Sequence, residues 1–147
     1  MVAPATPKRI LIVEDEESMR ELLRLHLSWA GYEVEVAEDA IAAGYSVLKA
    51  PPDLMVCDVE MPHMDGFELV AALRADAGIP KNLPVIFLTA DSDADGRARE
   101  LGAQFLEKPI RLEELLAAVA RHLPPPPRPG SLPSSHRPWW RGSARGR

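Results

Sequence analysis

The sequence predicts an α/β fold in which helices cover both faces of a doubly wound parallel sheet. Residues 8–123 alternate between short apolar runs of strand length and longer stretches whose apolar residues recur at helical spacing. The apolar runs do not alternate with polar residues, which is typical of strands buried on both faces of a parallel sheet. A strand–helix unit that recurs five times along the chain leads to this architecture.

The first two units lie between residues 10 and 49. A strand at residues 10–13 precedes a helical stripe that stops before Gly31, a residue type that commonly ends helices. The stripe consists of Met19, Leu22, Leu23, His26, Leu27 and Ala30. A weaker strand candidate follows at residues 33–37, and a second helix is expected at residues 39–49.

The remaining three units contain two strongly apolar strands and one weaker strand. In chain order we expect a strand at 54–57, a helix at 65–75, a strand at 85–88, a short helix at 93–101 before Gly102, and a weaker strand at 104–107. A fifth helix is marked by Leu112, Leu115, Leu116, Val119 and Leu123. Cys57, the only cysteine, lies within an apolar run and is expected in the core, and its being single excludes an internal disulfide.

Length and composition predict one domain with a segment on either side. A chain of 147 residues, 46% hydrophobic and 27% charged, can bury one ordinary core and has no room for a second full domain. We expect residues 1–7 to be an N-terminal extension and residues 8–123 to be the domain. Residues 124–147 are rich in proline and arginine, and we expect a disordered tail that begins with a stiff polyproline segment.

The charge is unevenly distributed along the chain. The formal net charge is −5, but residues 124–147 carry five arginines and no acid, which leaves 12 basic and 22 acidic residues in residues 1–123. Because an acidic body repels polyanions, nucleic-acid binding by the folded domain is disfavoured. No apolar run approaches the roughly 20 residues that span a bilayer, and the N-terminus lacks the apolar stretch of a secretory signal. We therefore expect a cytoplasmic protein with no membrane partner.

Polar side chains follow the predicted strands at the positions where such sheets bind ligands, beyond the carboxyl ends of the strands. Glu14 and Asp15 follow the first strand, and Asp58 follows the third. Thr89 follows the fourth strand, and Lys108, succeeded by Pro109, follows the fifth. We expect three carboxylates, a hydroxyl and an ammonium group to converge on one edge of the sheet.

This set of groups is suited to phosphoryl transfer onto a carboxylate. Three acids held together repel one another unless a hard cation binds them, and carboxylate and carbonyl oxygens suit Mg²⁺. A lysine supplies a positive charge for phosphate oxygens, and a threonine hydroxyl supplies a hydrogen bond. An aspartate can then act as the nucleophile while the surrounding positive charges neutralise the charge that develops.

Four motifs together resemble the receiver domains of bacterial response regulators. They are VEDE at 13–16, CDVEMPHMDG at 57–66, FLTA at 87–90 and GAQFLEKP at 102–109, all in the family's order. The resemblance covers residues 8–123. It implies a flavodoxin-like fold, a five-stranded parallel sheet of order 2-1-3-4-5 with five helices.

The resemblance also implies roles for the residues around the metal. Asp58 would be the phosphorylated residue, and Asp15 and Asp58 would ligate Mg²⁺. Glu14 would position the metal through water, and the backbone carbonyl of Glu60 would complete the protein ligands.

Further roles are implied for the residues that respond to the phosphoryl group. Lys108 would contact it and would be joined to Pro109 by a cis bond, and Thr89 would swing toward it after transfer. Phe105 matches the aromatic residue whose rotation accompanies the switch, and Glu60 and Asp91 match positions that flank the route of the attacking water. The interval from Thr89 to Lys108 is about one helical turn shorter than is usual in the family, which affects the fourth helix.

The function implied is that of a phosphorylation-dependent response regulator in a two-component phosphorelay. The donor would be a histidine kinase or a histidine phosphotransfer protein, and phosphorylation of Asp58 would switch the binding of an output protein that the sequence does not identify. A weak homodimer stays open. Such a chain is a signalling module rather than an enzyme, although it assists its own magnesium-dependent phosphorylation and slow dephosphorylation.

Two alternatives belong to other classes. A pseudo-receiver would act as a constitutive docking or dimerisation module, but the complete set of acids, threonine and lysine argues against it. A metal-dependent phosphatase of the haloacid dehalogenase type also uses an aspartyl nucleophile and generally has a second acid two residues later, where Glu60 stands. That alternative leaves the VEDE motif and the Lys-Pro pair unexplained.

Overall fold

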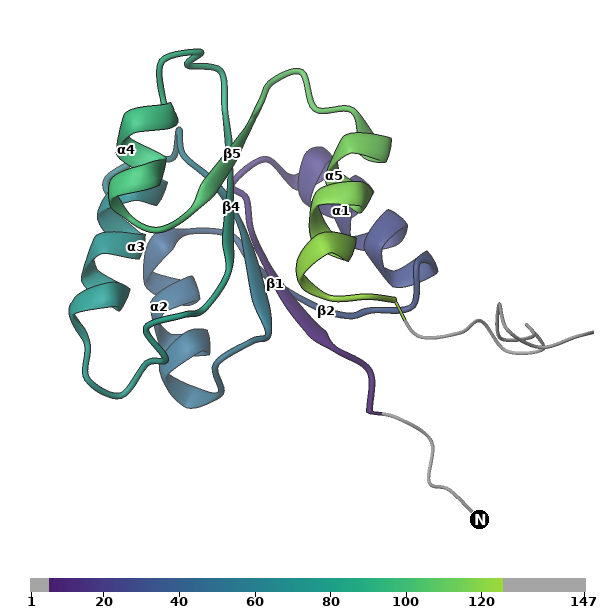
Figure 1. The fold of residues 1–147 in the computed structure, drawn as a ribbon, viewed down its shortest axis with the longest axis horizontal. Helices are drawn as coiled ribbons and strands as arrows, with labels where there is room; N and C mark the ends of the chain where they lie inside the picture. The colour runs from purple at the N-terminus through teal and green to yellow at the C-terminus, as the bar shows by residue number, and fades with distance from the viewer. Residues whose placement is uncertain (1–5, 126–147) are drawn as a thin grey trace, which may run out of the picture.

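The computed structural model describes residues 6–125, which form a five-stranded parallel sheet flanked by helices (Figure 1). The strands are β1 (Arg9–Val13), β2 (Glu33–Ala37), β3 (Leu54–Asp58), β4 (Val85–Thr89) and β5 (Gln104–Glu107). The helices are α1 (Glu17–Trp29), α2 (Ala40–Lys49), α3 (Gly66–Ala75), α4 (Asp95–Glu100) and α5 (Leu112–His122). The strand order is β2-β1-β3-β4-β5, with every neighbouring pair parallel, so the fold class and strand order given above are confirmed.

The helices form one layer on each face of the sheet. Figure 1 shows α1 and α5 on one side and α2, α3 and α4 on the other. Successive residues of a strand point to opposite faces, and accordingly Ile10 and Ile12 pack with α1 and α5, whereas Leu11 and Val13 pack with α2 and α3. The core is therefore divided by the sheet into two apolar clusters.

Burial follows the position of each strand in the sheet. Every residue of β3 and β4 is buried, as the continuous apolar runs predicted, because both strands lie inside the sheet. The edge strands β2 and β5 are largely half-buried or exposed, which explains their weaker sequence signal.

Several boundaries differ from the sequence prediction, and the starts of β1, α2 and α3 differ by one residue each. Asp58 and Thr89 are the last residues of their strands rather than the first residues after them, because Asp58 is in register with Leu88 and Thr89 with Glu107. The fourth helix is Asp95–Glu100 and not residues 93–101. Its start is delayed because the Asp91 carboxylate accepts a hydrogen bond from the Asp93 N–H, which holds the preceding residues in a turn.

The two predicted flanking segments, residues 1–7 and 124–147, lie mostly outside the residues that the structure describes. Residues 1–5 and 126–147 are not described, so the N-terminal extension and the disordered tail stay predictions. Among residues 6–125, no helix is both long enough and apolar enough to cross a membrane.

Candidate functional site

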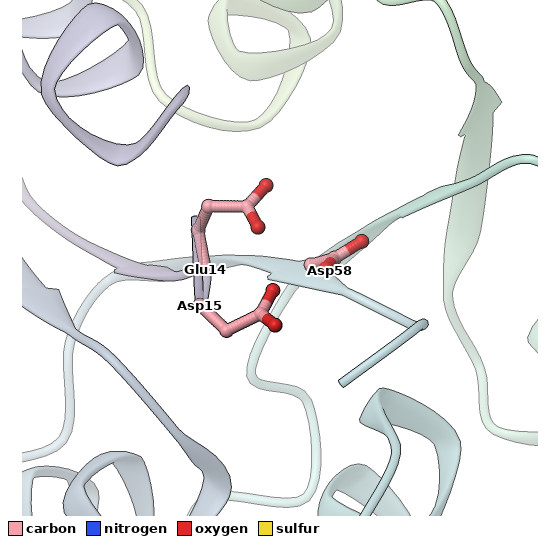
Figure 2. Close-up of side chains that lie close together, drawn as sticks. All are labelled: Glu14, Asp15 and Asp58. Atoms are coloured by element: carbon pink, nitrogen blue, oxygen red, sulfur yellow. The ribbon is translucent and has the colours of Figure 1, made fainter. Parts of the chain in front are cut away.

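Three carboxylates converge at the carboxyl edge of the sheet (Figure 2). Glu14 and Asp15 follow β1, and Asp58 ends the neighbouring strand β3. One oxygen from each carboxylate lies within 4.8 Å of the others. Glu14 and Asp58 are buried, whereas Asp15 is exposed, so the cluster is open to solvent on one side.

The β1–α1 loop is held by hydrogen bonds that fix the two adjacent acids. The Glu14 N–H donates to the Ala37 carbonyl at 3.1 Å, which extends the pairing of β1 with β2 by one residue. Arg20 of α1 reaches back over the loop, and its guanidinium donates to the Glu14 carbonyl at 3.0 Å and to the Asp15 carbonyl at 3.5 Å. The loop backbone is therefore clamped to the first turns of α1.

Gly66 allows the start of α3 to lie directly against the backbone of Asp58. A Cβ atom on Gly66 would stand 2.5 Å from the Asp58 carbonyl oxygen, closer than any unstrained contact. Asp65 and Glu68 form a reciprocal capping box that fixes where α3 begins. The Asp-Gly pair of the MPHMDG motif thus places the helix start and leaves room for Asp58.

Lys108 forms an ion pair with Asp58 across the sheet edge. Its Nζ lies 2.5 Å from Asp58 Oδ1, and its side chain is 28% exposed while that of Asp58 is 1% exposed. The Lys108 N–H donates to the Thr89 carbonyl at 2.7 Å, which positions the residue after β5. The bond between Lys108 and Pro109 is cis, as the resemblance predicted.

The Glu60 carboxylate binds the hydroxyl of Thr89. Thr89 Oγ1 donates to Glu60 Oε1 at 2.9 Å, and the Ala90 N–H donates to the same oxygen at 2.6 Å. Thr89 Oγ1 also accepts a hydrogen bond from the Asp91 N–H at 3.1 Å. In this structure the hydroxyl is therefore engaged by Glu60 and Asp91, and Lys108 is the partner of Asp58.

The electrostatics of the cluster are unfavourable for its negative charges. Burial, and next the charge of Asp58, raise the pKa of Glu14 from 4.5 to about 7. Burial also raises the pKa of Asp58, although the hydrogen bond and charge of Lys108 oppose this effect. Burial lowers the pKa of Lys108, but the Asp58 hydrogen bond and the surrounding carboxylates outweigh it, so the pKa is raised and the ammonium is held in its charged form.

This donor set fits Mg²⁺. The three carboxylates supply hard oxygen ligands within reach of one ion, and one of them faces solvent, so an ion held here keeps water molecules in its other positions. Burial, and next the charge of Asp58, raise the pKa of Glu14, so a negative charge is unfavourable here, and a divalent cation bound by the cluster would offset that cost.

Phe105 is half-buried on β5 and packs against the core cluster on the α2, α3 and α4 side. Cys57 is buried in the core, as expected, and burial raises the pKa of its thiol.

The sequence predicted that Glu14, Asp15, Asp58 and Lys108 lie close together, and the structure places them so. Sequence reasoning missed the Arg20 clamp and the bond between Glu60 and Thr89, because neither leaves a pattern in the sequence.

Comparisons with known proteins point to one family. The family model for the response regulator receiver domain matches residues 10–120. The response regulator MprA of Mycobacterium sp. (strain KMS) is 41% identical over 116 residues, which cover 77% of this chain and 49% of the relative. MprA of Mycobacterium tuberculosis is 43% identical over 114 residues, covering 76% of this chain and 48% of the relative. This chain thus spans about half the length of the curated relatives that it matches.

Solved structures agree with the sequence relatives. The chemotaxis protein CheY4 of Vibrio cholerae superposes with a TM-score of 0.74 at 36% identity, covering 80% of this chain and all of that one. The response regulator TrrA of Thermotoga maritima, solved in complex with Mg²⁺ and BeF, gives a TM-score of 0.71 at 33% identity over 79% of this chain and 99% of that one. These findings do not support the pseudo-receiver alternative or a haloacid dehalogenase phosphatase. The chain belongs to the response regulator receiver domain family and is a signalling module of two-component systems.

Proposed function

We propose that this receiver domain accepts a phosphoryl group on Asp58 in a magnesium-dependent reaction and that the modification switches the binding of an output protein. The observation that carries the proposal is the surroundings of one carboxylate. Asp58 is buried, Lys108 Nζ lies 2.5 Å from one of its oxygens, and two further acids lie within 4.8 Å. An aspartate without a catalytic role would not be expected to combine burial, a lysine partner and a cluster of acids.

The phosphoryl donor in this proposal is a phosphohistidine of a histidine kinase or of a phosphotransfer protein. A carboxylate oxygen of Asp58 forms a bond to phosphorus while the P–N bond of the donor breaks, and its electron pair remains on the imidazole nitrogen, which takes up a proton. The Asp58 carboxylate becomes an acyl phosphate. Lys108 moves its ammonium from the carboxylate to the phosphoryl oxygens and neutralises part of their charge.

Mg²⁺, held by Asp15 and Asp58 with the carbonyl of Glu60 and with Glu14 acting through water, would neutralise charge on the phosphoryl oxygens when bound. The chain's own residues prepare the site for this. The Arg20 clamp fixes the carbonyls of Glu14 and Asp15, and burial of Glu14 keeps that acid against the cluster.

The switch in this proposal is an exchange of hydrogen-bond partners by Thr89. Its hydroxyl donates to Glu60 at 2.9 Å in this structure. When Asp58 carries a phosphoryl group, the phosphoryl oxygens are additional hydrogen-bond acceptors, and the group carries more negative charge than the Glu60 carboxylate. The Thr89 hydroxyl then turns from Glu60 to a phosphoryl oxygen. In this proposal Phe105, which is half-buried, turns inward when the Thr89 hydroxyl moves.

Hydrolysis of the acyl phosphate ends the signal and is slow in this account, so the reaction is a timer rather than a metabolic activity. The curated relatives are about twice as long as the matched segment. The binding of an output protein and a cytoplasmic location both stay predictions.

The test is phosphorylation of the full chain by acetyl phosphate with and without Mg²⁺, followed by phosphate-affinity gel electrophoresis. We expect the wild type to be modified only when Mg²⁺ is present and the variant Asp58→Asn not to be modified. Asp93→Asn is the matched control, because Asp93 is an exposed carboxylate outside the cluster, and this variant should behave like the wild type. Equal modification of Asp58→Asn and the wild type would contradict the proposal.

A second variant tests the switch separately from the transfer. Glu60→Ala removes the acceptor that holds the Thr89 hydroxyl, so the active arrangement should be reached more easily. We expect tighter binding of beryllium fluoride with Mg²⁺, measured by titration calorimetry. Weaker binding would mean that Glu60 does not restrain Thr89.

A further inference from the structure

Residues of α2 and α3 line an apolar groove. These two helices cover the face of the sheet opposite α1 and α5 (Figure 1). The groove encloses about 420 Å³, a volume within the range of ligand sites, and its lining is mostly apolar. Its sides are formed by Ile41, Tyr45 and Leu48 of α2 and by Leu69 and Ala72 of α3. A second hollow, which includes Ile41 and Met64, continues it toward the carboxyl edge of the sheet.

The groove displays side chains that ordinarily lie in a core. Tyr45 is 73% exposed, Ile41 69% and Leu48 56%, and these residues recur at the spacing of one helical face. The opposite face of α2, with Ala43 and Val47, is fully buried against the sheet. Helix α2 is thus apolar on both faces, which is typical of a helix that is covered on both sides.

Gly44 deepens the groove at its centre. It lies in the middle of α2, where glycine disfavours helix, yet a Cβ atom at this position would meet nothing within 4 Å. An alanine would favour the helix and would fit, so the fold does not require glycine here. The missing side chain leaves room for a bulky group between Ile41 and Leu48.

The charges around the groove favour a cationic occupant. Asp39 stands at one end, at the start of α2, and Asp76 at the other end, after α3, and neither forms an ion pair with another residue in the part of the chain that the structure describes. Residues 1–123 carry 12 basic and 22 acidic residues, so a second copy of this domain would approach against electrostatic repulsion. An apolar segment flanked by arginines has the complementary chemistry.

This chain contains such a segment, which leaves α5 at the sheet edge where one end of the groove lies, although α5 covers the opposite face of the sheet. Residues 124–147 contain five arginines, no acid and the adjacent pair Trp139 and Trp140. Helices α2, α3 and α5 each follow a parallel strand and return the chain to the amino edge of the sheet, so the end of α5 lies at the same edge as the ends of α2 and α3 (Figure 1). Fifteen residues lie between Leu123 and Trp139, and this length of chain can span up to about 50 Å, more than the width of about 35 Å of a domain of this size.

We propose that the segment around Trp139 and Trp140 docks in the α2–α3 groove of its own chain. The indole rings lie over Gly44 between Ile41 and Leu48, and arginines on either side approach Asp39 and Asp76. Burial of the aromatic rings supplies most of the binding, because exposed ion pairs contribute little. The site is distinct from the acidic cluster, so the docking does not depend on phosphorylation of Asp58.

The test uses the fluorescence of the two tail tryptophans in the full chain. Trp29 is first replaced in Trp29→Phe, so that all tryptophan emission comes from Trp139 and Trp140. Gly44→Leu places a bulky side chain in the groove at a position where a Cβ atom meets nothing within 4 Å, and Gly44→Ala is the matched control, since a single methyl group leaves most of the groove open. Circular dichroism checks that all variants are folded.

We expect emission at shorter wavelength and slower quenching by acrylamide in Trp29→Phe and in its Gly44→Ala derivative. The Gly44→Leu derivative should emit at longer wavelength and be quenched faster, and addition of salt should release the tail only in part. Emission that does not differ between Gly44→Leu and Gly44→Ala would overturn the proposal.

A second measurement identifies the occupant without altering the groove. Amide NMR spectra of the full chain and of its Trp139→Ser/Trp140→Ser variant should differ at residues 41–48 and 69–76 and remain the same at Glu14, Asp58 and Lys108. The differences should not change on dilution, because the contact is within one chain. Differences that vanish on dilution would show docking onto a second copy, and an absence of differences in α2 and α3 would show that the tail does not occupy the groove. Either result overturns the proposal.

Discussion

Replacing Glu14 by glutamine should stabilise the metal-free protein at alkaline pH. The side chain is buried beside Asp58, and its pKa is about 7 in the folded protein, compared with 4.5 when unperturbed. Between these two values the folded state binds a proton that the unfolded chain has already released. The folded protein therefore loses stability as the pH rises from 4.5 to 7, and the loss is complete above pH 7.

The size of the effect follows from the pKa difference. One pH unit corresponds to about 1.4 kcal/mol, so the ionised Glu14 destabilises the metal-free fold by at most about 3 kcal/mol at about pH 8. The glutamine side chain of the Glu14→Gln variant cannot ionise. Its amide oxygen can still accept the hydrogen bond that the Glu16 N–H donates to Glu14 Oε2 at 3.2 Å. The variant should therefore remove the charge and keep the loop.

The assay is urea denaturation in EDTA at about pH 8 and about pH 5. We expect Glu14→Gln to exceed the wild type by up to about 3 kcal/mol at the higher pH, and most of this gap to close at the lower pH, where the folded wild type is protonated at Glu14. Glu107→Gln, at the exposed end of β5, is the control and should show no such pH-dependent gap. With Mg²⁺ in excess, the wild type should gain more stability than Glu14→Gln. The prediction is wrong if Glu14→Gln and the wild type are equally stable at the higher pH, or if their difference in stability is the same at both pH values.

Three further variants test the geometry of the site. Gly66→Ala places a Cβ atom 2.5 Å from the Asp58 carbonyl oxygen and should cost about 1–3 kcal/mol in urea denaturation while slowing phosphorylation; unchanged stability would contradict that contact. Arg20→Lys keeps the charge but loses the hydrogen bonds that the guanidinium donates to the carbonyls of Glu14 and Asp15. The Kd for Mg²⁺ should rise by about fivefold, equivalent to about 1 kcal/mol, in a fluorescence or calorimetric titration. An unchanged Kd would show that these bonds do not shape the site. Phe105→Tyr should occupy the inward ring position in a smaller fraction of unphosphorylated molecules, because burying an unpaired phenol costs roughly 1–3 kcal/mol, and identical ring populations by NMR would count against this.

The sequence was sufficient for the fold because the signal is strong where burial is complete. The apolar runs that became β3 and β4 are buried at every position, and their length of five residues is typical of a strand rather than of a helix. The start of α4 was misplaced because acidic residues favour both turns and helix starts. In the structure, Asp91 binds the Asp93 N–H and makes a turn before Asp95.

The candidate site was predictable only in part. Acids at strand ends converge for topological reasons, which sufficed for Glu14, Asp15 and Asp58. The direction of a long side chain depends on tertiary packing instead. The sequence therefore could not predict the contact of Arg20 with the loop carbonyls or that of Glu60 with Thr89.

The position of the phosphoryl group tests the central proposal most directly. The full chain is treated with acetyl phosphate and Mg²⁺, the acyl phosphate is reduced with borohydride, and the peptides are sequenced by tandem mass spectrometry. We expect homoserine at position 58 and nowhere else, and only when Mg²⁺ is present. Reduced residues at other acids of the chain, or modification of position 58 that is independent of Mg²⁺, would contradict it.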